Sequence, residues 1–284
     1  MDATMNLPTS ELIPEEDPNM PPARRRRRRR SLLPGGADER YAFLDALAQK
    51  LIPSLDFFLF SLVCGLVFGV AILTNAPAMF ILAALVAPFM SPIAGLSLAV
   101  VFGSTRYLAQ SLAGMSIGSG IVFALGALAG LVSKFLPSAG LDFARSLSYF
   151  GWSSLVLLVT GTVLMIYLLV RAPGQRPLVA SVALAYTIYL PLGAAGFGLS
   201  SGVEGLWPDG LVVFVVHLAA AVLLGAAVLA LLGLRPVNVL GYTMGTTLVL
   251  AVAAAVIAFS GLGTALSARI AMPPPTPSAT HTEA

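Results

Sequence analysis

The chain has 284 residues, of which 57% are hydrophobic and 10% are charged, and its mean hydropathy is +0.90. An average soluble domain has roughly 25% charged residues, so this composition excludes an ordinary soluble protein and predicts an all-α, polytopic membrane domain with short flanks. The single cysteine, Cys64, excludes an intramolecular disulfide, and the two histidines form no Cys/His cluster that predicts a metal site.

The first 36 residues are predicted to be a disordered cytoplasmic arm. Residues 1–22 are acidic and rich in proline, without apolar periodicity, and the first long apolar run begins only near Leu55, so no signal peptide is expected. We expect the basic part of the arm to rest on anionic lipid headgroups, each basic residue contributing about 1 kcal/mol. A nucleic-acid-binding arm is less favoured, because no aromatic residue interleaves the run to stack on bases. The basic residues are Arg24, Arg25, Arg26, Arg27, Arg28, Arg29 and Arg30.

Residues 37–53 are predicted to form an amphipathic helix at the cytoplasmic interface. Apolar residues recur at helical spacing between Asp38 and Ile52, with charged residues between them. Such a helix lies in the interface plane with its apolar face toward the acyl chains. Pro53 then turns the chain into the membrane.

Residues 54–265 are predicted to be a transmembrane domain of about seven helices. A crossing takes about 20 apolar residues, and charged residues separate the apolar runs. With the N-terminus inside and the C-terminus outside, all but three of the 16 basic residues, Lys134, Arg145 and Arg269, fall in cytoplasmic segments, as the positive-inside rule requires. The proline-rich tail 266–284 is expected to be disordered and external. The predicted helices are 55–74, 77–103, 107–132, 152–170, 178–200, 210–233 and 238–262.

Two motifs carry a resemblance to a known family. The segments 72–78 (ILTNAPA) and 83–93 (AALVAPFMSPI) resemble a bacterial family of hydrophobic membrane proteins, domain of unknown function 389, and the similarity continues through 182–199 and 213–236. The resemblance implies a multi-pass protein of the bacterial cytoplasmic (inner) membrane. It implies no particular activity.

Helices 1–3 and 4–6 share a layout that predicts a 3+3 inverted repeat. In each unit a plain helix precedes a proline-interrupted helix, which carries Pro88 and Pro92 in helix 2 and Pro191 in helix 5. Because each unit has three crossings, the second must run opposite to the first, as in many secondary transporters. Shifting 83–132 by 99 positions aligns Pro92 with Pro191 but yields only eight identities in 50, where about five arise by chance, so the prediction rests on layout.

The broken helices predict a polar pathway at membrane depth. Each proline frees a main-chain carbonyl, and such groups are tolerated in a membrane only inside protein or at a water-filled cavity. His217 is the one titratable side chain deep within a predicted span, a position that suggests use. The alternatives are a packing kink, hydroxyls bonded to their own helix, and a histidine that only packs. The candidate pathway residues are Pro88, Ser91, Pro92, Tyr186, Thr187, Tyr189, Pro191 and His217.

Four glycines along the third helix have the small-xxx-small spacing of close helix packing or self-association, which allows a homo-oligomer. They are Gly114, Gly118, Gly126 and Gly130.

The predicted function is transporter-like or channel-like passage of a small solute through the broken-helix core. The alternative is a non-transporting membrane scaffold that acts through its basic arm and helix-packing faces. Motifs of metalloproteases and P-loop nucleotide-binding proteins are missing from the sequence, and we expect neither an enzyme nor a cofactor.

Overall fold

The computed structural model describes residues 51, 54–88, 90–136, 140–171, 178–234, 243 and 247. The chain divides into two units, Met1–Ala46 and Leu47–Ala284, and the described residues all belong to the second. The arginine arm, nearly all of the helix predicted at 37–53, the tail 266–284, and the seventh helix apart from two isolated positions lie outside this part. Every regular element within it is helical, which confirms the all-α prediction there.

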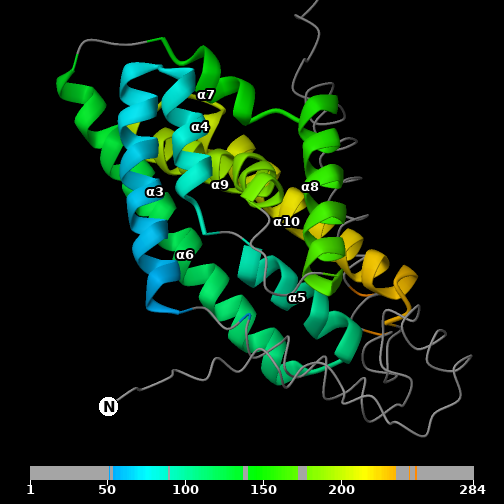
Figure 1. Ribbon diagram of the computed structural model, residues 1–284. Coiled ribbons are helices and arrows are strands. Elements are labelled where there is room, and N and C mark those ends of the chain that lie inside the picture. Colours follow the sequence, from blue (N-terminus) through cyan, green and yellow to red (C-terminus); the bar gives the residue numbers. More distant parts are fainter. Residues whose placement is uncertain are drawn as a thin grey trace, which may run out of the picture. The chain divides into compact units, whose positions relative to one another are not determined.

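The described helices follow the predicted spans closely (Figure 1). Five are long and apolar enough to cross a membrane, and six spans result if the bent pair α4 and α5 counts as one. Two short helices that the sequence analysis did not predict, η1 (Ser133–Phe135) and α7 (Asp142–Leu147), lie between the third and fourth spans. The long helices are α3 (Leu55–Thr74), α4 (Pro77–Val86), α5 (Met90–Phe102), α6 (Thr105–Val132), α8 (Trp152–Arg171), α9 (Leu178–Ser201) and α10 (Leu206–Leu231).

A tight turn joins α3 to α4. Asn75 ends α3 in the left-handed conformation, with φ 49°, and its backbone N–H bonds the carbonyl of Ala71. Asparagine adopts this conformation more readily than most residues. Pro77 then occupies the first turn of α4, where its missing N–H costs nothing. Local sequence alone therefore sets this turn.

Helix α9 is the central helix of the described part. It packs against α6, α10, α8 and α4, and Figure 1 shows it between α3 on one side and α8 on the other. Two thirds of its membrane window is buried by protein, against 39–44% for the other four spans. A proline-bearing helix is therefore held on several sides at once.

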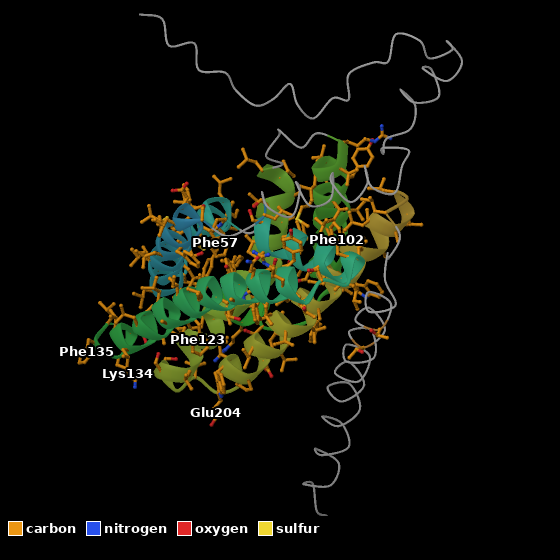
Figure 2. All side chains as sticks on the ribbon, turned by 90° about the horizontal axis from the view of Figure 1, so that it is seen from below. Phe57, Phe102, Phe123, Lys134, Phe135 and Glu204 are labelled. Atoms are coloured by element: carbon orange, nitrogen blue, oxygen red, sulfur yellow. The ribbon has the colours of Figure 1, made fainter. Side chains whose placement is uncertain are left out.

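Helices α6 and α9 run parallel. A Cβ on Gly118 would lie 2.9 Å from the Tyr189 hydroxyl, and one on Gly130, further along α6, would meet the carbonyl of Phe197, further along α9. The end of α6 and the α9–α10 turn consequently lie at the same end of the helices. In Figure 2 Lys134 and Phe135 mark that end of α6, Glu204 in the α9–α10 turn lies toward them, and Phe102 lies toward the other end.

Small residues let α6 and α9 touch through their backbones. A Cβ on Gly126 would collide with the carbonyl of Gly193, and a Cβ on Gly196 would collide with the carbonyl of Phe123. Lipid tails are as apolar as leucine, so helices in a bilayer associate through such van der Waals contact rather than through the hydrophobic effect. The glycines therefore set how closely the central helix is held.

We predict that Gly126→Ala lowers the free energy of unfolding by about 1–3 kcal/mol, because main-chain atoms of α9 cannot rotate out of the way of the added methyl group. Gly120→Ala, in the same helix, is the control, since a Cβ there meets nothing within 4 Å. It should be neutral or stabilise by up to about 1 kcal/mol. Thermal unfolding of both variants in detergent measures the difference, and equal midpoints would contradict this account of the packing.

Candidate functional site

The first feature of the site is the break between α4 and α5. The two helices are bent by 53°, with Ala87 and Pro88 between them. Pro88 has no N–H, so the carbonyl of Ala84 loses its helical donor. Helix α4 has 10 residues and so spans about 15 Å at 1.5 Å per residue, half of a hydrocarbon core of about 30 Å. The break therefore falls near the middle of the membrane.

Of the two prolines predicted to interrupt this span, Pro88 marks the break. Pro92 lies in the first turn of α5, where a helix accepts proline without losing an internal hydrogen bond.

The second feature is Pro191, which does not break its helix. Helix α9 is continuous from Leu178 to Ser201 with Pro191 inside it, so the predicted break in the fifth helix is wrong. The physical reason is a replacement donor. Proline at 191 removes the hydrogen bond to the carbonyl of Thr187, and the Nδ1 of His217 in α10 lies 2.8 Å from that oxygen.

This hydrogen bond determines the tautomer of His217. A main-chain carbonyl can only accept, so Nδ1 must carry the proton. In the neutral ring Nε2 is then an acceptor. His217 is 1% exposed, and its Nε2 is buried without a hydrogen-bond partner among the described residues. Nδ1 therefore bonds α9, and Nε2 remains an acceptor without a partner among the described residues.

His217 lies near the middle of the membrane, in contact with an aromatic ring. It is about 16 Å along α10 from Leu206 at 1.5 Å per residue, a depth comparable to that of the α4–α5 break. The ring of Phe150 meets the imidazole edge to face, with centroids 5.4 Å apart. Phe150 comes from the segment between α7 and α8, which the sequence analysis treated only as an external loop.

That segment is the part of the site the sequence analysis missed. Phe143 packs on Phe80 of α4 with centroids 4.6 Å apart, and Ala144 and Leu147 are buried. These residues and Phe150 follow a helical apolar spacing, a signal that could have revealed a helix packed on the bundle. The charged residues Asp142 and Arg145 between them concealed it.

Two of the polar residues predicted on α9, Thr187 and Tyr189, have hydroxyls with different surroundings. The hydroxyl of Thr187 bonds the carbonyls of Ala183 and Leu184 in its own helix, at 3.0 and 3.2 Å. The hydroxyl of Tyr189 points toward α3 and α6, where it interacts with side chains of Ser61 and Ser119.

The structure thus brings Thr187, Pro191 and His217 together, and groups the other candidates elsewhere. Tyr186 is only partly buried. Pro88, Ser91 and Pro92 mark the α4–α5 break, and Pro92 and Pro191 are both buried rather than exposed to lipid. On α6, Gly118, Gly126 and Gly130 lie against neighbouring helices, and Gly114 is buried. The described residues contain no group of three or more His, Cys, Asp or Glu that could hold a metal ion.

We predict that His217→Phe lowers the free energy of unfolding by about 1–3 kcal/mol, because it leaves the buried carbonyl of Thr187 without a donor. Adding Pro191→Ala should restore stability, since alanine supplies the missing N–H within α9. The double-mutant cycle, with Pro191→Ala alone as the fourth corner, should give a coupling of about 0.5–3 kcal/mol. Additive effects in detergent unfolding would show that the histidine does not replace the helical bond.

Comparison with known proteins agrees with the resemblance seen in the sequence. Residues 84–223 match the model of the family described as domain of unknown function (DUF389). This region includes Pro88, Pro191 and His217. No curated protein and no solved structure matches the chain. Residues 84–223, just under half of the chain, are thus similar to the DUF389 family.

Proposed function

We propose that this protein is a transporter-like or channel-like membrane protein, built as a 3+3 inverted repeat, that passes a small solute through the region of the α4–α5 break and His217. One observation carries the proposal. Two close helix contacts between the halves of the molecule are related to each other by the same 99-residue offset that aligns Pro92 with Pro191.

The first contact lies between α5 and α10, where the hydroxyl of Ser97 bonds the carbonyl of Val222 at 3.2 Å. The second lies between α9 and α6, where Gly196 abuts the carbonyl of Phe123. Ser97 and Gly196 are 99 positions apart, and so are Phe123 and Val222. A two-fold relation between the units would place matching residues in matching contacts, and this agreement is independent of sequence identity, since neither pair is identical.

The helix pairings have the same reciprocity. Helix α6 of the first unit packs on α3 of its own unit and on α9 of the other, and α10 of the second unit packs on α8 of its own and on α5 of the other. In each unit the proline-bearing helix therefore packs against the last helix of the other unit. In transporters with inverted repeats the substrate site lies near the midplane at the repeat interface, beside discontinuous helices.

The two units differ at the residues that surround their prolines. The offset pairs His217 with Gly118, and Thr187 with Pro88. The second unit therefore has a side chain at this position that bonds a main-chain carbonyl, whereas the matching glycine in the first unit has no side chain to do so. This difference supports an open break in the first unit, with main-chain carbonyls near mid-depth as ligands for a solute.

We place the protein in the bacterial cytoplasmic membrane with its N-terminus inside, and expect lipid headgroups at the basic arm. The scaffold alternative depends on the arginine arm, so removal of residues 1–36 separates the two functions. Flux should survive that deletion, whereas a scaffold would lose its partners.

The inverted arrangement predicts that the α5–α6 and α9–α10 turns face opposite sides of the membrane. Thr105→Cys and Glu204→Cys, in a Cys64→Ala background, should react with a membrane-impermeant maleimide from opposite faces of oriented vesicles. Lys134→Cys is the control and should react from the Glu204 side. Labelling of positions 105 and 204 from the same face would exclude the repeat.

The proposed pathway predicts that Pro88→Ala lowers solute flux at least tenfold, because alanine restores an N–H at the break and allows α4 and α5 to join. Pro77→Ala is the matched control, since proline in the first turn of α4 breaks no hydrogen bond. Stopped-flow light scattering of proteoliposomes exposed to glycerol, urea, choline or acetate measures flux. Unchanged flux in Pro88→Ala would contradict the pathway, and no flux of any panel solute in the wild type would contradict the function.

A further inference from the structure

We infer that Nε2 of His217 is a binding contact for the solute, and that the solute is a small uncharged molecule with an N–H or O–H donor. The inference deepens the proposed function: passage of the solute rests on that function, whereas binding at His217 is testable without it.

His217 lacks a hydrogen-bond partner for its Nε2 among the described residues. The 2.8 Å hydrogen bond to the Thr187 carbonyl holds the proton on Nδ1, so Nε2 presents a lone pair. That atom is buried and has no partner among the described residues. A buried acceptor left unsatisfied costs free energy, and native structures rarely contain one without a reason. The missing partner must therefore be a hydrogen-bond donor.

Two contacts of the imidazole fix the direction in which Nε2 points. His217 is fixed from one side by α9 through the Thr187 carbonyl and from another by the edge-to-face contact with Phe150. Turning the ring so that Nε2 faced Thr187 would break the Nδ1 hydrogen bond to the Thr187 carbonyl. That bond replaces the one lost to Pro191. The ring is thus oriented in advance, which lowers the entropy cost of binding a donor.

The helices around His217 carry few charged residues. Helices α5, α7, α8 and α9 pack on α10. Neither α5 nor α9 contains a charged residue, and on the other two helices the charges are Asp142 and Arg145 in short α7 and Arg171 at the end of α8. On α10 itself Asp209 lies in the first turn. Among these described helices, an ion stripped of water at the level of His217 would find no countercharge, at a large free-energy cost, so the fitting solute is neutral.

The test uses the fact that the chain has only two histidines. With His281→Asn in the tail, ¹⁵N-histidine labelling reports on His217 alone in lipid nanodiscs. The Nδ1 resonance should be that of a protonated nitrogen and Nε2 that of an acceptor. Glycerol or urea should shift the Nε2 resonance in a saturable way and leave Nδ1 unchanged, whereas choline and acetate should shift neither.

A second readout is flux in proteoliposomes. His217→Asn retains an amide N–H at the position of Nδ1, which can bond the Thr187 carbonyl, but has no atom at Nε2. We expect this variant to unfold at the wild-type temperature and to lose at least tenfold in glycerol and urea flux. His217→Phe, which removes both nitrogens, should lose stability as well.

The outcomes separate the two hypotheses. Saturable Nε2 shifts without flux of any panel solute would support the binding contact and overturn the proposed function. Flux with no Nε2 shift, or undiminished flux in His217→Asn, would retain the function and overturn the inference. Movement of choline or acetate, together with Nε2 shifts from these ions, would overturn the neutral-solute assignment. Lack of both flux and shift would overturn both.

Discussion

The hydrogen bond from His217 to the Thr187 carbonyl is the interaction on which the centre of this protein depends. In lipid a main-chain carbonyl has no water to bond, so a proline within a spanning helix needs a donor from elsewhere. Pro191 leaves the Thr187 carbonyl without its helical donor, in the helix that contacts most of the others. Nδ1 of His217 in α10 supplies the donor, 2.8 Å from that oxygen. The bond keeps α9 continuous and leaves the imidazole with one nitrogen unused at mid-depth.

Pro191 and Pro88 have different effects on their helices, and only the second is part of the proposed pathway. In α9 the lost hydrogen bond is replaced and the helix stays continuous from Leu178 to Ser201. Between α4 and α5 the chain opens at Pro88 and the two pieces diverge by 53°. A helix break near the midplane beside a continuous helix is consistent with the proposed solute pathway.

Close packing without large side chains completes this frame. Gly126 and Gly196 bring the backbones of α6 and α9 into contact, and Ser97 makes the corresponding approach to α10 through its hydroxyl. The matching offset of these contacts supports the proposed inverted repeat, although sequence identity between the halves is near chance.

The sequence by itself determined where the described spans lie, because charge is excluded from the bilayer and a crossing has a set length. For example, α3 begins and ends where the predicted span from Leu55 to Thr74 does. It also identified Pro88, Pro191 and His217 as the unusual residues. Only the tertiary structure decided what each proline does, since the donor that preserves α9 comes from another helix. It also revealed Phe150 against His217, because a loop residue contacts the core only through a fold that local pattern does not encode.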